Sequence, residues 1–200
     1  MPRGRPRKFD EDLALMGAMN LFWAKGLSAT SLDDLAIAMS MNRPSIYNAF
    51  GNKEAIYRKS LERFCGQLDQ ELQSTLSSGK SLVGALHAFF DQAIDVYCSS
   101  QPPLGCLMIC TAPSEAINHP EVGDDLKGLI KRLDAGLTDR LVRAQHEGEL
   151  PEAAQPKLGA QLLQATLQSI ALRARSGHSK TSLRKLARYS INLIVSDKGG

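Results

Sequence analysis

Polar and basic side chains of the kind that hydrogen-bond to nucleic acids gather between residues 43 and 50. The segment reads RPSIYNAF, and its apolar residues Ile46 and Phe50 are spaced to share one face of a helix. The side chains left for the other faces are short or polar: Arg43, Ser45, Tyr47, Asn48 and Ala49. A major groove about 12 Å wide admits a helix that carries such a face. The segment is therefore a candidate for direct contact with duplex DNA.

The excess positive charge of the chain is concentrated at its start. Residues 1–60 hold nine Lys and Arg against six Asp and Glu, and residues 61–200 hold fifteen of each, so the net charge of +3 belongs to the first segment. Four of the nine bases precede residue 9. A basic end beside a neutral body is expected where that end meets a polyanion. A solvated, solubilising tail would carry the same charges.

Residues 2–8, here called the arm, contain the sequence Arg3-Gly4-Arg5-Pro6, which resembles the core of an AT-hook. Glycine lets the backbone approach the floor of a narrow minor groove, and proline keeps the chain extended. The guanidinium groups then meet the deep negative potential of that groove. We expect Arg3, Arg5 and Arg7 to insert into the minor groove beside the contact made by residues 43–50.

Three short helices are predicted to position these residues. Asp10, Ser31 and Asn42 are suitable N-caps for helices over about 10–25, 31–39 and 43–50. The second and third helices are separated by about three residues, which is the outline of a helix-turn-helix, although an ordinary helical hairpin has the same outline. A small core shared by the three helices would fix the third one in place. Its members would be Leu15, Phe22, Leu35, Met39, Met41, Ile46 and Phe50.

The rest of the chain also has helical periodicity and lacks the alternation typical of strands. The expected helices run from about Lys53 to the Ser77-Ser78-Gly79 break, then over 81–99, 105–117, 121–147, 155–175 and 180–196. The predicted fold class is all-α, with an N-terminal three-helix helix-turn-helix domain followed by a larger C-terminal helical domain for ligand binding and dimerisation. The boundary is expected between residues 52 and 53.

Residues 22–57, FWAKGLSATSLDDLAIAMSMNRPSIYNAFGNKEAIY, resemble the DNA-binding domain of the TetR family of bacterial transcriptional regulators. The resemblance rests on Lys25-Gly26, on Thr30-Ser31-Leu32, on Leu35-Ala36 and on the run from Ser45 to Glu54. Two features depart from it. Met39 and Ser40 stand where the turn usually has a small residue and glycine, and Ala49 stands where histidine or tyrosine is frequent.

The resemblance implies a role for each matching side chain. Phosphate contacts would come from Thr30, Ser31, Tyr47 and Lys53, and base-edge contacts from Arg43, Pro44, Ser45 and Asn48. Arg43 is the candidate for a bidentate contact with guanine. It further implies a homodimeric repressor on a palindromic double-stranded operator, with a small-molecule inducer or a thiol modification that releases the DNA.

Self-association is expected to use the last two helices, because a single helix-turn-helix buries too little surface for useful specificity. The resemblance implies a four-helix bundle between two subunits. Alternatively, about half of these side chains only cover the core of their own subunit. The candidates are Leu158, Leu162, Leu163, Thr166, Leu167, Ile170, Leu183, Leu186, Ala187, Ser190, Ile191 and Ile194.

The middle of the chain holds an apolar segment with two cysteines, Cys106 and Cys110, at i and i+4. Its Gly105-Cys106-Leu107 resembles a segment in one branch of the family, some of whose members sense electrophiles or oxidants. No Lys or Arg lies within this stretch to stabilise a thiolate, which favours inert packing. The candidates for ligand binding or redox sensing are Phe90, Ile94, Tyr97, Cys98, Cys106, Met108, Ile109 and Cys110.

Other classes of protein are disfavoured by what the sequence lacks. No apolar run approaches the ~18 residues of a membrane span, and the start of the chain has no apolar signal segment. The four cysteines form no C-x-x-C pair, which is typical of reduced thiols in a cytoplasm. Catalytic motifs are missing, so we expect no enzyme, no cofactor and no metal site. The alternative is a helical-bundle adaptor or interaction module that does not bind DNA.

Overall fold

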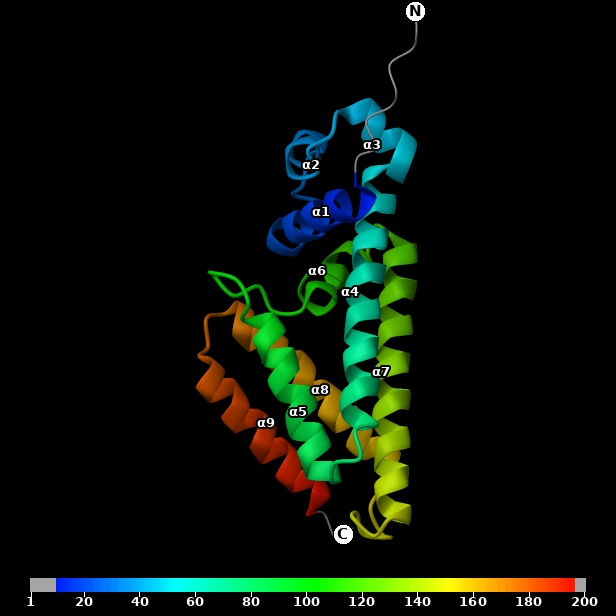
Figure 1. The fold of residues 1–200 in the computed structure, drawn as a ribbon, viewed down its shortest axis with the longest axis vertical. Helices are drawn as coiled ribbons and strands as arrows, with labels where there is room; N and C mark the ends of the chain where they lie inside the picture. Colours follow the sequence, from blue (N-terminus) through cyan, green and yellow to red (C-terminus); the bar gives the residue numbers. More distant parts are fainter. Residues whose placement is uncertain (1–9, 197–200) are drawn as a thin grey trace, which may run out of the picture. The chain divides into compact units, whose positions relative to one another are not determined.

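The computed structural model describes residues 10–196, without the side chains of residues 71 and 72. Every regular element in this part of the chain is an α-helix, as the sequence predicts (Figure 1). The helices are α1 (Glu11–Lys25), α2 (Leu32–Ala38), α3 (Arg43–Phe50), α4 (Lys53–Leu76), α5 (Leu82–Tyr97), α6 (Leu107–Glu115), α7 (Pro120–His146), α8 (Pro156–Arg175) and α9 (Lys180–Val195). Their ends lie close to the expected positions because most are set by local capping residues and glycines.

The chain divides into two compact units, unit 1 up to Glu62 and unit 2 from Arg63. The division falls inside α4, ten residues beyond the expected position after residue 52. The reason is that the first turns of α4 belong to the core of unit 1, where Ile56, Tyr57 and Leu61 are buried. The ring of Tyr57 meets Phe22 of α1 edge to face, with the centroids 5.1 Å apart.

Unit 1 encloses a small apolar core between α1, α2, α3 and the start of α4. Gly17 is the point of closest approach, because a Cβ added there would lie 2.1 Å from the carbonyl oxygen of Ala38. Only a residue without a side chain allows α1 to come this close to the end of α2. This contact, together with buried Phe22, Leu35 and Ile46, fixes α3 within the unit.

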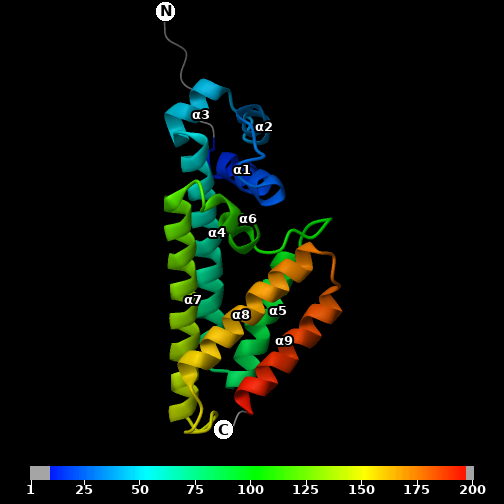
Figure 2. The same ribbon diagram turned by 180° about the vertical axis from the view of Figure 1, so that it is seen from behind.

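Unit 2 is a bundle in which α8 contacts α5, α6, α7 and α9, and α9 contacts α5 (Figure 2). The C-terminal half of α4 lies beside α7, where Arg132 Nε donates to Asp69 Oδ2 at 3.0 Å. Gly105 begins the turn into α6 with φ +69°, and a Cβ there would lie 2.3 Å from the carbonyl oxygen of Ala171. The segment before α6 can therefore lie directly on the backbone of α8.

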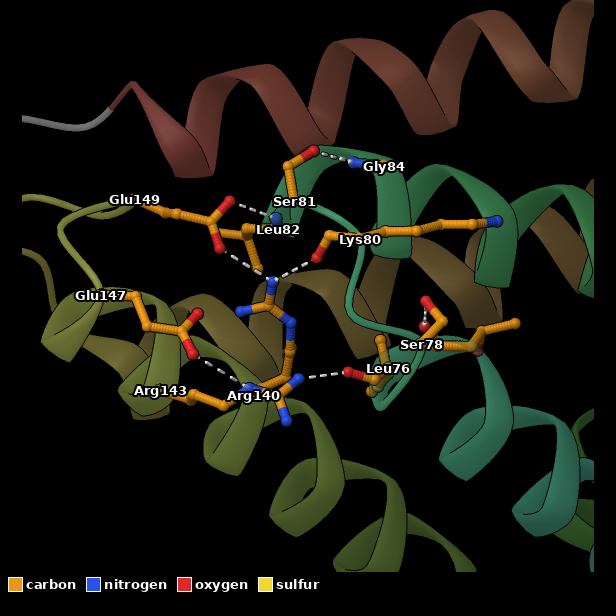
Figure 3. A network of polar contacts seen from close by, with 11 residues as sticks. Leu76, Ser78, Lys80, Ser81, Leu82, Gly84, Arg140, Arg143, Glu147 and Glu149 are labelled. Carbon is orange, nitrogen blue, oxygen red and sulfur yellow. Dashed lines mark hydrogen bonds and ion pairs between the residues drawn. The ribbon is translucent and has the colours of Figure 1, made fainter.

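A polar network ties the loops at one end of unit 2 together (Figure 3). Arg140 of α7 is almost completely buried, and its Nη2 donates to Glu149 Oε1 at 3.0 Å and to the Lys80 carbonyl at 3.2 Å. The other oxygen of Glu149 accepts from the backbone N–H of Leu82 at 2.6 Å. Arg143 donates to the carbonyl of Leu76, the last residue of α4. The network joins α4, α5 and α7 to the loop before α8.

Candidate nucleic-acid interface

The start of α2 is held by a reciprocal pair of hydrogen bonds. Ser31 Oγ accepts from the backbone N–H of Asp34, and Asp34 Oδ2 accepts from that of Ser31, both at 3.1 Å. These bonds satisfy two N–H groups that a helix start otherwise leaves open. The bonds from Ser31, backbone first and then hydroxyl, together with Lys25 hold the pKa of the Asp34 carboxyl below its ordinary value. Ser31 is thus the N-cap, as expected, and forms a capping box with Asp34.

The turn between α2 and α3 depends on one residue in the left-handed region. Ser40 has φ +52°, a conformation that is uncommon outside glycine, asparagine and aspartate. It allows the N–H of Met41 to reach back to the carbonyl of Ala36 at 3.0 Å. The turn therefore uses a left-handed residue even though serine stands where the family usually has glycine.

The third helix begins immediately after the turn with an ordered cap. Asn42 Oδ1 accepts from the backbone N–H of Ser45 at 2.9 Å, and Pro44 lies in the first turn, where its missing N–H is not needed. Ile46 and Phe50 are buried. The opposite face points to solvent, as expected, and exposes Arg43, Pro44, Tyr47 and Asn48, with Ser45 at its edge half-buried.

Two of the four side chains expected to contact phosphates also bond within unit 1. Thr30 is 1% exposed, and its hydroxyl donates to the Gly26 carbonyl at 2.6 Å, so it closes the loop after α1. Lys53 Nζ donates to the carbonyls of Leu27 and Thr30, both at 2.9 Å, and so fastens the same loop to α4. Both side chains therefore stabilise the loop after α1. Ser31 and Tyr47 remain exposed.

Arg43 has a partner that the sequence reasoning missed. Its Nε and Nη2 donate to Oδ1 of Asp33 on α2, at 2.9 and 2.5 Å. The hydrogen bond and the charge of Asp33 raise the pKa of Arg43 above its ordinary value. The available signal was an acidic residue in the first turn of α2 and a basic residue at the start of α3, but two helices of unknown crossing geometry do not reveal such a pair.

The sign of the net charge of unit 1 depends on the arm. From residue 10 to residue 62 the sequence has five Lys and Arg against seven Asp and Glu. Lys25 is paired with Asp34 at 3.2 Å, and Lys59 lies over the ring of Phe50. Arg3, Arg5 and Arg7 lie outside the described residues. The described part of unit 1 is thus acidic overall, and the four bases before residue 9 reverse its sign.

The twelve candidates for self-association divide by burial. Six face the core of their own subunit, so their side chains are not available to a partner: Leu163, Leu167, Ile170, Leu183, Ala187 and Ile191. Leu158 and Leu162 are exposed, and Thr166, Leu186, Ser190 and Ile194 are half-buried. Three exposed apolar residues were missed, Leu172, Tyr189 and Leu193. These residues lie within two positions of a buried residue on the same helix, an offset that periodicity alone does not resolve.

The candidates for ligand binding or redox sensing lie mainly in the core of unit 2. Phe90, Ile94, Tyr97, Cys106 and Met108 are buried, and Cys98, Ile109 and Cys110 are half-buried. Burial raises the pKa of the Cys106 thiol to about 12, and partial burial also raises the pKa of Cys98 and of Cys110. The thiols are therefore protonated at neutral pH and weak nucleophiles.

An open cleft that the sequence did not indicate lies between α4 and α7. Its volume is about 420 Å³, and three arginines of α7 contribute to its walls, Arg132, Arg140 and Arg143. Asp69, Gln73 and Ser77 face them from α4 and the following turn. Asp139 also lines the cleft, and the three arginines already bond to Asp69, to Glu149 and to the Leu76 carbonyl. The cleft is therefore polar and of mixed charge, with a volume in the range of small-molecule sites.

Metal and membrane sites are not seen in the described part of the chain. Among the side chains that the structure describes, no three of His, Cys, Asp or Glu gather closely enough to hold a metal ion. No helix in the described part of the chain is long and apolar enough to cross a membrane.

Comparison with known proteins gives matches over both units. The model of the tetR family of bacterial regulatory proteins matches residues 14–59, and that of a tetracyclin repressor-like C-terminal domain matches residues 83–190. The HTH-type transcriptional repressor ComR of Escherichia coli K12 is 32% identical over 192 residues, which cover 96% of this chain and 91% of ComR.

Solved structures agree in fold. A cysteine-substituted variant of the regulator CifR, in complex with a 26-base-pair operator, superposes with a TM-score of 0.83 at 26% identity, covering 94% of this chain and 98% of CifR. The reduced form of E. coli NemR superposes with a TM-score of 0.80 over 93% and 97% of the two chains, and at 21% identity it supports the fold alone.

Proposed function

Because the chain belongs to the TetR family of bacterial transcriptional regulators, we propose that it is a cytoplasmic homodimeric repressor without catalytic activity. In this role each subunit places α3 in the major groove of one half of a palindromic operator, and the arm enters the adjacent minor groove. ComR is described as a repressor, and the CifR complexes contain operator DNA, which supports this assignment.

The observation that carries the proposal is the outward face of α3. Its cap and its two buried residues hold the helix against unit 1, while Arg43, Pro44, Tyr47 and Asn48 remain exposed. Side chains that can hydrogen-bond or stack at the start of a helix fit base edges and phosphates in a major groove. An adaptor that does not bind DNA would have no use for this face or for a basic arm.

Dimerisation is supported by an exposed apolar stripe, defined as Leu158, Leu162 and Leu172 on α8 and Tyr189 and Leu193 on α9. Each of these side chains is more than half exposed. On α8 the stripe continues through the small residues Ala165 and Ser169, at alternating spacings of four and three residues. That spacing is typical of a helix that packs against other helices in a bundle. The proposed partner for the stripe is the same surface of a second subunit.

Release of the operator is better explained by a ligand than by a thiol reaction. The raised pKa values of Cys98, Cys106 and Cys110 disfavour a fast reaction with an electrophile. The cleft between α4 and α7 offers an open volume with a polar lining. We therefore favour a polar small molecule as inducer, bound beside the C-terminal half of α4.

A salt titration of binding to duplex DNA tests the assignment, together with light scattering for the oligomeric state. We expect a two-subunit species that selects one palindromic sequence from a randomised duplex library, with affinity that falls steeply as salt rises. A monomer at working concentration, or binding without sequence preference, contradicts the proposal. Operator release by an alkylating agent that persists when Cys98, Cys106 and Cys110 are all replaced by Ser excludes a thiol route through these three residues.

A further inference from the structure

Asp33 holds Arg43 in a way that leaves a particular pair of its N–H groups free. Both bonds from Arg43, from Nε and from Nη2, end on the same oxygen, Oδ1 of Asp33. A guanidinium group has five N–H donors in a rigid plane. The pair with Asp33 uses two of them on one edge. The remaining N–H of Nη2 and the nearest N–H of Nη1 lie parallel at the far end of the group.

Two parallel N–H donors match the O6 and N7 acceptors that guanine displays in the major groove. We propose that Asp33 is a positioning residue for DNA recognition, which fixes the guanidinium plane of Arg43 so that its far end meets guanine. Asp33 then determines the base preference at one position of each half-site without contacting the DNA. The inference rests on the proposed function, since it presumes that α3 lies in the major groove.

The pair is suited to orientation more than to stability. The side chains of Arg43 and Asp33 are 55% and 69% exposed, and ion pairs at such exposed positions contribute little to folding. An unheld arginine has many rotamers, and ordering it upon binding opposes association. A partner on the neighbouring helix removes much of that freedom in advance.

The carboxylate of Asp33 also has an unfavourable effect that makes the inference testable. Its negative charge repels the phosphates of any duplex, whatever the sequence. Removing the charge while keeping the shape should therefore have two opposite consequences. Affinity for random duplex should rise, whereas the preference for guanine opposite Arg43 should fall. A residue with only a structural role would lower both.

The experiment compares the wild type with Asp33→Asn and with Glu62→Gln, an equal change of charge at an exposed residue of unit 1 away from Arg43. Selection from a randomised duplex library defines the preferred site, and Arg43→Ala identifies the base pair that loses its preference. Competition binding with each of the four base pairs at that position then measures discrimination. Asp33→Glu tests rescue by a longer carboxylate.

We expect Asp33→Asn to reduce the preference for guanine at that position by about three- to tenfold. Other positions stay unchanged, the melting temperature stays unchanged, and affinity for random duplex rises about twofold. Glu62→Gln keeps the full preference for guanine at that position. Asp33→Glu keeps at least half of the logarithm of the wild-type discrimination ratio.

Three results overturn the inference: an unchanged preference in Asp33→Asn, an equal loss at every position with a lowered melting temperature, or no guanine dependent on Arg43. A wild type that binds no duplex, or binds without sequence preference, overturns the proposed function itself. Sequence-specific binding with an unaltered Asp33→Asn profile overturns only the role of Asp33.

Discussion

Replacing Glu149 by alanine should destabilise unit 2 strongly and in a pH-dependent way. The change removes the only carboxylate bonded to Arg140 in the described structure (Figure 3). The Arg140 side chain is 2% exposed, and its Nη2 would then donate to the Lys80 carbonyl alone. Breaking a fully buried ion pair costs about 3–5 kcal/mol. Glu149 is 28% exposed, so water can replace part of what is lost. We therefore expect a loss of about 2–3 kcal/mol at neutral pH, to which the lost bond to Leu82 N–H contributes.

The dependence on pH follows from the pKa of Glu149. The bond from the backbone N–H of Leu82, and then the bond and charge of Arg140, hold this pKa below its ordinary value of 4.5. A carboxyl whose folded pKa is lowered contributes stability above its unfolded pKa and loses it as the pH falls through the folded value. The difference between wild type and Glu149→Ala should thus be constant near neutral pH and shrink below about pH 4.5.

Urea unfolding followed by circular dichroism at several pH values measures the effect. Glu147→Ala is the matched control, since its carboxylate lies 4.0 Å from Arg143 at an exposed position and should contribute under about 1 kcal/mol. The double variant Arg140→Met/Glu149→Ala should regain about half of the loss, because no buried charge remains. Equal losses in Glu149→Ala and Glu147→Ala, or a difference that persists unchanged at pH 3, would refute the reasoning.

Three further predictions concern the arm, unit 1 and the stripe. Deleting residues 2–8 should make the slope of log K for operator binding against log salt concentration less negative, by about 0.9 per lost phosphate contact. An unchanged slope would show that the arm makes no phosphate contact. Gly17→Ala should lower the stability of unit 1 by about 1–3 kcal/mol because its Cβ meets the Ala38 carbonyl, whereas Gly66→Ala, in open space on α4, should be neutral or stabilising in the same urea titration. Leu162→Glu should produce monomers by light scattering with helicity intact, while Leu13→Glu, equally exposed on α1, should remain dimeric.

Local signals explain why the helices could be predicted so closely. Asp10, Ser31, Asn42, Ser81 and Ser179 each accept a backbone N–H at the start of a helix, which is an interaction within four residues. Contacts between residues so close in the chain can be predicted from the sequence. Gly51 and Asn52 mark a helix boundary, which is why the sequence predicts a division after residue 52, whereas the compact unit extends to Glu62. The packing of Tyr57 against Phe22 is a long-range contact that carries no local signal.

The sequence predicts the features of the candidate interface that depend on one helix alone. It does not predict the contacts that depend on how two elements pack together. The exposed face of α3 follows from its periodicity. The resemblance implies phosphate contacts for Thr30 and Lys53, and in the structure both side chains also bond to carbonyls of the loop after α1, whose course only the folded chain defines. Asp33 was missed for the same reason, because its bond to Arg43 depends on how α2 crosses α3.

The acidic balance of unit 1 without the arm has a consequence for the fate of the protein in a cell. A single proteolytic cut after Lys8 would remove four positive charges and leave a helix-turn-helix whose own field repels phosphates. In the proposed dimer the clipped chain, which keeps the buried cores of both units, would still pair with intact chains. Each such mixed pair would hold one competent half, so a minor amount of cleavage would silence a larger share of the regulator.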